Sequence, residues 1–545
     1  MIHRVALLLC LGLLAACSER AATDASGLPA GAARPAAPEA QHLRRQIDAS
    51  PRTLDPSLSV DVPTQRILDD LFEGLVRLDP AGNIVPAVAS HWEHSPDNLV
   101  WTFHLLPDVR WSNGDPLTAA DFVYAWRRTV DPATASQSAQ QLAPIVNALD
   151  VAAGRMPSTS LGVKALDAHT LEVRLLAPTP YFLYLVTNNY LFPLHEPSIR
   201  AKGADWTRVG NLVSNGAFYL ENQRINGAIQ LRRNPQFHDV ATVQLERLTY
   251  FPVEDRSAAT SRYLAGDLDV TDGFAVEDID WLRQSLGGQV QLAPYFGTVL
   301  LTMQVSRPPF DSRPLRQALT MAIDRDVLTQ KLLRQLYLPA YNLVPPSDGY
   351  APAVPEWASW PAERRHARAR ELYAEAGYSA AHPLVVDLSW PTGGADTRRL
   401  LEALTSMWRV TLGAEVRLSN SEWRVFQQDR RLHKLSLYWN AWIGDYPYPL
   451  TFLELFQRSG GQNSSQYFRP EFEAAIAASA VGSDEVQRLA DLKRAESLLN
   501  DDAPFIPVYF YQSRHLVRPY VQGWQGNVMD RHLSQYLSVP AGQGG

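Results

Sequence analysis

Segments patterned as strands alternate with segments patterned as helices in the second half of the chain, and this alternation constrains the fold most. Helix patterns cover residues 311–338, 361–376, 396–412 and 485–499. Strand patterns cover residues 384–390, 414–418 and 505–511. Alternating strands and helices predict α/β layers, in which helices cover a sheet. Because 545 residues exceed what one hydrophobic core supports, we expect two or three domains.

The first half of the chain contains shorter elements separated by turns. We expect strands over 42–47 and 99–105, and helices over 64–76 and 122–129. Thr118 precedes the last of these helices, and Asp121 follows three residues later. This spacing is typical of a capping box, in which each side chain satisfies a free backbone N–H group at the helix start.

Composition and charge exclude several classes of function. The formal net charge is −7 and no basic stripe is present, which argues against nucleic acid as a partner. The sequence contains no His-Glu-x-x-His, no Gly-x-Ser-x-Gly and no Walker-type phosphate loop. We therefore expect neither an enzyme nor a cofactor or metal. Energy for any transport step must come from a partner ATPase.

Both cysteines, Cys10 and Cys17, lie at the N-terminus, so the folded body can form no internal disulfide. A short basic start precedes an apolar run from Val5 to Leu14, which is too short to span a bilayer. Leu-Ala-Ala-Cys then follows and resembles a bacterial lipobox. The resemblance implies that residues 1–16 are a lipoprotein signal peptide and that Cys17 becomes lipid-modified. The alternative is an ordinary secretory peptide with an incidental cysteine.

Residues 17–40 are rich in Ala, Pro, Gly and Ser, and contain almost nothing to bury. We interpret them as a flexible tether. The body of the protein is then expected in the cell envelope, anchored to a membrane by lipid and facing the periplasm or the extracellular side. Ser18 stands where an aspartate commonly favours retention in the inner membrane, so the choice of membrane stays open.

Residues 435–456 contain the candidate binding site. The segment starts as a strand and is expected to turn at a Trp442–Gly444–Asp445–Tyr446 corner, where Asp445 stands among the aromatic residues Trp439, Trp442, Tyr446 and Tyr448. An acid in a water-poor aromatic pocket is suited to holding a cationic group. The alternative is that Asp445 caps a helix over 450–456 and that the aromatic residues are core.

An ordered set of segments from about residue 45 to 540 resembles the extracellular solute-binding proteins of family 5, and within it the oligopeptide-binding components of ABC importers. The segments that carry the resemblance include Leu54-Asp55-Pro56, Asp70-Leu71-Phe72-Glu73-Gly74-Leu75, Trp111-Ser112-Asn113-Gly114, Ser214-Asn215-Gly216, Arg233-Asn234-Pro235, Ala322-Ile323-Asp324-Arg325, Trp442-Ile443-Gly444-Asp445-Tyr446 and Ile506-Pro507-Val508-Tyr509. Each segment alone is weak evidence for the family, whereas the whole set in this order is specific to it.

The resemblance implies an α/β fold with two lobes, like the class II periplasmic binding proteins, and a ligand cleft between the lobes. It also implies a third, smaller domain. We expect a discontinuous lobe I at 41–67, 196–300 and 510–540, an extra domain at 68–195 and lobe II at 301–509.

The resemblance also implies the ligand contacts. Asp445 would meet the ammonium group of an extended peptide, and Trp442 and Ile443 would lie beside its first residues. Val62, next to Asp61, would pair with the peptide backbone from the other lobe. Tyr446 belongs to the same site. Ser214-Asn215-Gly216 is interpreted as structural, and Tyr509 and Tyr511 as core residues near the hinge.

Two departures from the family pattern concern the ligand's carboxylate. Trp439 stands where the family's peptide binders often place an arginine, while Arg430 matches a second family arginine. Val60 replaces a glutamate near the first pairing segment, although Asp61 is adjacent. A free carboxylate would thus lose one partner, so the ligand's far end lies elsewhere, or the ligand is longer or modified.

We expect a monomeric peptide receptor that delivers its ligand to an ABC permease and ATPase. One alternative keeps the fold but binds a cell-wall muropeptide or another small solute. Another is a surface signalling lipoprotein without a transport role.

Overall fold

The computed structural model describes residues 41–540 except 225–226, 348, 393–394, 459–462 and 482–483. The lipobox and the whole of the expected tether, residues 17–40, lie outside the described residues. Within the described part of the chain, no helix is both long and apolar enough to cross a membrane.

A six-stranded sheet forms the centre of one lobe, which we call lobe II. Its strand order is β12 (Leu338–Pro339), β16 (Phe505–Leu516), β11 (Val290–Met303), β15 (Leu437–Ile443), β13 (Val385–Pro391) and β14 (Glu415–Ser421). Side chains alternate between its two faces, so that Val299 and Leu301 enter one core while Leu300 enters another. The sheet therefore has a hydrophobic core on each side.

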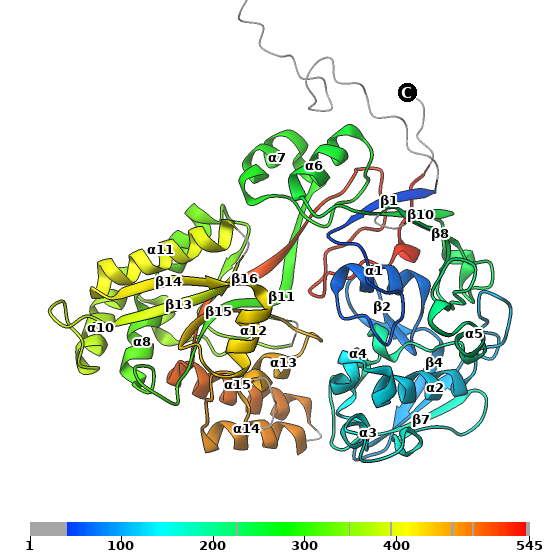
Figure 1. Ribbon diagram of the computed structural model, residues 1–545, viewed down its shortest axis with the longest axis horizontal. Coiled ribbons are helices and arrows are strands. Elements are labelled where there is room, and N and C mark those ends of the chain that lie inside the picture. Colours follow the sequence, from blue (N-terminus) through cyan, green and yellow to red (C-terminus); the bar gives the residue numbers. More distant parts are fainter. Residues whose placement is uncertain are drawn as a thin grey trace, which may run out of the picture.

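Helices cover both faces of this sheet. The first core is closed by α8 (Arg313–Met321), α10 (Ala362–Glu375) and α11 (Ala395–Leu412), and the second by α13 (Leu450–Leu453), α14 (Pro470–Val481) and α15 (Glu485–Asp502). Figure 1 shows α11 and α14–α15 on opposite sides of the strands. The expected α/β layers are confirmed.

The other lobe, lobe I, is built on a four-stranded sheet in the order β1 (His42–Ile47), β10 (Arg247–Pro252), β9 (Ile229–Arg233) and β8 (Phe218–Gln223). A second four-stranded sheet has the order β4 (Ala89–His94), β5 (Val100–Leu105), β7 (Thr170–Arg174) and β6 (Val163–Ala165). It packs with α2 (Ala119–Val130), and one continuous core joins both sheets. The capping box expected at Thr118 and Asp121 is present.

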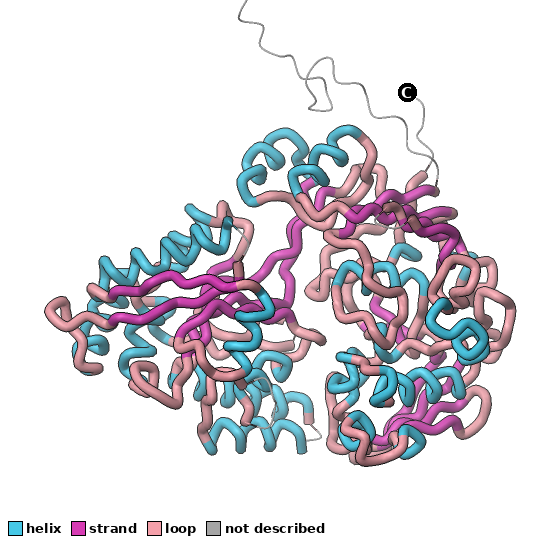
Figure 2. The backbone as a smooth tube through the Cα atoms, viewed as in Figure 1, coloured by secondary structure: helices cyan, strands magenta, loops and turns pink. Residues whose placement is uncertain are grey.

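Two long antiparallel strands connect the lobes. β11 pairs with β16 from Val290–Leu516 at one end to Thr302–Phe505 at the other. Figure 2 shows this pair rising out of the lobe II sheet toward the helices at the top, α6 (Arg256–Ala265) and α7 (Ile279–Leu286). The two-lobed fold expected from the sequence is thus present, and the segments around these strands position the site.

The Ser-Asn-Gly motif holds the C-terminal end of α1 (Val62–Leu71) in place. Asn215 accepts a hydrogen bond from the Glu73 N–H group at 3.2 Å and donates one to the Glu73 carbonyl at 2.8 Å. A Cβ atom on Gly216 would lie 2.5 Å from the Leu71 carbonyl carbon, so only glycine fits there. The motif is structural, as interpreted from the sequence.

Three expected elements differ in extent. The helix expected over 64–76 ends at Leu71, because the chain becomes extended at Phe72. The helix pair expected over 311–338 is cut short, since after a π-helical turn over 328–332 the chain takes left-handed backbone angles at Arg334 and Gln335. Trp442 and Ile443, expected in a corner, still belong to β15, and the turn begins at Gly444.

Candidate functional site

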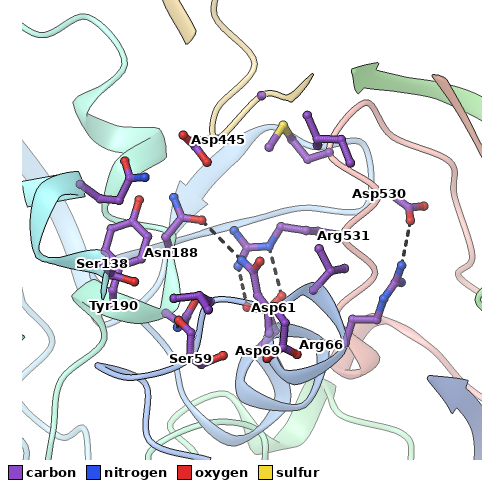
Figure 3. A pocket seen from close by; sticks show the side chains of 18 of the residues that line it. Ser59, Asp61, Arg66, Asp69, Ser138, Asn188, Tyr190, Asp445, Asp530 and Arg531 are labelled. Atoms are coloured by element: carbon purple, nitrogen blue, oxygen red, sulfur yellow. Dashed lines mark hydrogen bonds and ion pairs between the residues drawn. The ribbon is translucent and has the colours of Figure 1, made fainter. Parts of the chain in front are cut away.

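A cavity of about 360 Å³ lies where the start of α1 faces the end of β15. Its walls come from distant parts of the chain, which include the α1 start, the 137–141 segment, the 188–190 segment, Tyr295 of β11, the turn after β15 and the C-terminal segment (Figure 3). The lining includes Ser59, Val60, Asp61, Val62, Gln65, Arg66, Asp69, Ser138, Asn188, Tyr190, Tyr295, Ile443, Asp445, Asp530 and Arg531. We call this cavity the acid end of the cleft.

A second cavity of about 480 Å³ adjoins the first. The two share Val62, Arg66, Tyr295, Ile443 and Asp530, so they form one continuous cleft. The second cavity continues along β15 and β16 and is lined further by Asp48, Arg256, Asp272, Leu333, Tyr337, Trp439, Tyr509, Tyr511, Gln512 and Arg514. We call it the aromatic end.

Asp445 follows β15 and directs its carboxylate into the acid end (Figure 3). The side chain is partly buried, and among the described residues no donor pairs with its carboxylate. Burial raises the pKa of Asp445 to about 6. An acid in this condition gains from any cation that enters, because the cation replaces the lost hydration.

Tyr190 lies across the cavity from Asp445. Its hydroxyl group is buried and forms no hydrogen bond with the described residues. Burial, and then the nearby charge of Asp445, raise the pKa of Tyr190 well above its ordinary value. The acid end thus presents an unpaired carboxylate and an unpaired hydroxyl donor, which suits a polar, cationic ligand group.

The edge of β15 that faces the cleft is free over most of its length. β13 pairs with β15 only at Leu437 and Tyr438. On the other edge, the Gly444 N–H group donates to the Phe296 carbonyl of β11. Because backbone groups alternate in direction along a strand, those of Trp439, Ala441 and Ile443 point to the free edge. The Ala441 N–H group is bonded to the Asn440 side chain at 3.0 Å.

Ion pairs hold the floor of the acid end rigid. Arg531 donates to both Asp69 carboxylate oxygens, at 2.6 and 3.1 Å. Arg66 contacts Asp530 at 2.9 Å and Asp272 at 3.1 Å. Although burial opposes it, the charges of His515 and Arg66 hold the pKa of Asp530 well below its usual range. These pairs satisfy one another, and the Asp61 carboxylate accepts a hydrogen bond from the Thr64 N–H group, so within the described chain Asp445 is the acid of this cavity whose carboxylate has neither an ion pair nor a hydrogen bond.

One described group has the composition of a metal site: His515, Asp530 and His532. Both histidines direct Nε2 at the same Asp530 oxygen, at 2.7 and 3.1 Å. The Arg66 guanidinium occupies the other oxygen of that carboxylate. These hydrogen bonds explain why the three side chains lie together, so we assign the group a structural role.

The structure places four of the seven predicted ligand residues in the cleft. Val62 and Ile443 line both ends, Asp445 lines the acid end and Trp439 lines the aromatic end. Val62 is the first residue of α1, and the Asp61 side chain caps that helix by accepting from the Thr64 N–H group at 2.9 Å.

Trp442, Tyr446 and Arg430 line neither end. Strand alternation turns Trp442 toward the second core of lobe II, where its indole N–H donates to Thr451. Tyr446 stacks on Tyr181 at 4.0 Å between ring centres. Arg430, on α12 (Trp423–Arg431), lies 3.5 Å from the Asn440 side chain. The aromatic residues that line the acid end are Tyr190 and Tyr295, in place of the tryptophan and tyrosine of the 439–448 segment that the sequence predicts.

Five residues that the sequence did not predict also shape the acid end, namely Arg66, Asp69, Tyr190, Asp530 and Arg531. Arg531 and Asp69 are 462 positions apart, and no local pattern signals such a pair. A partial signal was the placement of Arg66 and Asp69 one helical turn apart, just after Val62.

The chain is similar to known proteins over most of its length. The model of the bacterial extracellular solute-binding proteins, family 5, matches residues 83–464. The periplasmic oligopeptide-binding protein OppA of Salmonella typhimurium is 37% identical over 523 residues, which cover 95% of each chain.

Two solved structures share the fold. The unliganded open form of the periplasmic murein tripeptide-binding protein MppA superposes with a TM-score of 0.82 at 35% identity, covering 92% of this chain and 98% of that one. Haemophilus influenzae OppA in complex with the peptide RPPGFSPFR superposes with a TM-score of 0.78 at 34% identity, covering 92% of this chain and 100% of that one. The family match and these relatives together establish that the chain belongs to family 5 of the bacterial extracellular solute-binding proteins.

Proposed function

We propose that this protein captures peptides in the cleft between its lobes and delivers them to an ABC importer. The observation that carries the proposal is Asp445, a partly buried carboxylate without a cationic partner at the end of a free strand edge. The ammonium group of a peptide supplies that partner. A charge pair formed in a site closed to water is stronger than one formed in solvent.

The free edge of β15 accounts for the rest of the affinity. An extended peptide with its ammonium group at Asp445 lies along Ile443, Ala441 and Trp439 and adds a strand to the sheet. Backbone hydrogen bonds of this kind do not depend on the ligand's side chains. Val62, the first residue of α1, bounds the ligand from lobe I.

The relatives support this function. The Salmonella typhimurium protein is named for oligopeptide binding, and the Haemophilus influenzae structure holds a peptide. Both solved relatives above are binding proteins, which supports a role in binding without catalysis.

The placement of the protein in the cell follows from its N-terminus. We propose cleavage before Cys17, lipid attachment there and a body that faces the periplasm as a monomer. The division into lobe I (41–67, 196–300 and 510–540), extra domain (68–195) and lobe II (301–509) is part of the same proposal. Changing Cys17 to Ser tests the anchor: the variant should leave the membrane fraction, whereas retention there would argue against lipidation.

Isothermal titration calorimetry with di- to pentapeptides of mixed sequence tests the binding function. We expect peptides to bind, N-acetylated peptides to bind far more weakly, and Asp445→Ala to remove the difference between the two. Asp205→Ala, at an exposed acid outside the cleft, is the matched control and should bind like the wild type. Failure of every peptide, or unchanged binding by Asp445→Ala, would overturn the proposal.

A muropeptide is a second candidate ligand, and the similarity to MppA favours it. Including the murein tripeptide in the same titration separates the two candidates. Preference for it over common tripeptides by tenfold or more would assign the cleft to cell-wall peptides.

A further inference from the structure

We propose that Arg514 binds the ligand's free carboxylate at the aromatic end of the cleft; this inference rests on the proposed function. Arg514 lies on β16 and lines the aromatic end together with Trp439. It thus offers a cation in the cavity where Trp439 stands in place of the arginine expected from the family pattern.

The other charges of the aromatic end are already paired. Its lining contains three arginines and three aspartates. Arg66 contacts Asp272 and Asp530, and Arg256 contacts Asp48 at 3.4 Å. Among the described residues no carboxylate forms an ion pair with Arg514. The cavity therefore contains a cation whose natural partner is an incoming anion.

The guanidinium of Arg514 is also held in place by neighbouring rings, and one of its nitrogen atoms lacks a hydrogen-bond acceptor. Its Nη1 atom is buried and forms no hydrogen bond with the described residues. Its central carbon lies 5.8 Å from the centre of the Phe274 ring and 5.7 Å from that of the Tyr337 ring. Contacts with two rings hold the planar group in place. A planar guanidinium fixed in this way matches a carboxylate, which can accept two parallel hydrogen bonds.

The cleft as a whole is complementary to a zwitterion. An unpaired acid, Asp445, stands at one end, and an unpaired guanidinium, Arg514, at the other. Both ends share Ile443 and Val62, so one extended chain can reach both. The aromatic end begins at Ile443 and reaches Trp439, which is six positions before Asp445. At about 3.3 Å per residue this spacing corresponds to peptides of roughly three to six residues.

The test compares each peptide as a free acid and as its C-terminal amide, in the wild type and in Arg514→Gln. We expect the wild type to prefer the free acid by about 10- to 100-fold, which is typical of a hydrogen bond between charged groups. Arg514→Gln should bind both forms equally, at about the affinity of the wild type for the amide. Arg514→Lys retains the charge but not the planar group that donates two parallel hydrogen bonds. It should therefore recover part of the preference for the free acid that Arg514→Gln loses.

Arg232→Gln is the matched control, because this arginine pairs with Glu221 on lobe I away from the cleft. It should leave the ratio of acid to amide affinity unchanged. Equal binding of acid and amide by the wild type, or an unchanged preference in a folded Arg514→Gln variant, would overturn this inference. If amides bind well and still depend on Asp445, the proposed function stands without this subsite. If neither form binds, both proposals fail.

Discussion

Replacing Asp445 by Asn should make the ligand-free protein more stable at neutral pH while weakening its binding of peptides. Burial raises the pKa of Asp445 from an ordinary value of 3.8 to about 6. Keeping this carboxylate ionised in the folded state at pH 7.5 therefore costs about 3 kcal/mol, at 1.36 kcal/mol for each pH unit. Asn is nearly isosteric and cannot ionise, so the variant avoids the cost.

The sign of the pH dependence follows from the raised pKa of Asp445. Below about pH 3 the group is mostly protonated in both the folded and the unfolded state, so wild type and variant should be about equally stable. The penalty in the wild type grows as the pH rises from about 3 to 6 and is complete by about pH 7. The predicted stabilisation by Asp445→Asn thus approaches about 3 kcal/mol at pH 7.5 and falls to about 0.5 kcal/mol at pH 4.

Urea unfolding without ligand at the two pH values measures this difference. A saturating peptide should reverse the order at pH 7.5, because only the wild type gains the full free energy of binding. Asp205→Asn, at an exposed acid, should shift the unfolding free energy by less than about 0.5 kcal/mol at either pH. A variant that is no more stable than the wild type at pH 7.5, or a difference independent of pH, would refute the reasoning.

Three further substitutions test the scaffold by chemical or thermal unfolding. Gly216→Ala should cost more than about 3 kcal/mol, because its Cβ meets the α1 backbone, whereas Gly288→Ala, with open space around it, should be nearly neutral; similar values for both would contradict the clash. Arg531→Gln should cost about 3–5 kcal/mol by leaving the buried Asp69 without its partner, and a loss below 1 kcal/mol would show that the pair is dispensable. Glu496→Ala should cost at least about 3 kcal/mol, since its buried carboxylate accepts four hydrogen bonds, and an unchanged unfolding midpoint would refute that role.

The fold could be predicted from the sequence where local pattern and tertiary packing agree. The strands at 384–390, 414–418 and 505–511 are confirmed as β13, β14 and β16, because their apolar side chains enter cores on a covered sheet. The prediction that the helix continues past Leu71 was wrong. Leu75 and Val76 are apolar because they belong to the core, and their helical spacing was incidental.

The site was predictable along β15 and at Val62, the first residue of α1. Asp445, Ile443 and Trp439 belong to a single contiguous segment, and the family resemblance points to it directly. Tyr190, Arg531 and Arg514 reach the same cleft from segments far away, and the chain crosses between lobes before they meet. Which aromatic residues surround Asp445 depends on how lobe I faces the end of β15, and strand alternation alone does not determine this.

Peptide recognition in the proposed function depends on one contact, between Asp445 and the ammonium group of a bound peptide. A crystal structure of the protein with a tripeptide measures it directly. We predict the peptide nitrogen at about 2.8–3.0 Å from the Asp445 carboxylate, with the peptide backbone along the free edge of β15. A peptide bound with its nitrogen away from Asp445, or with Asp445 turned to solvent, would contradict the account.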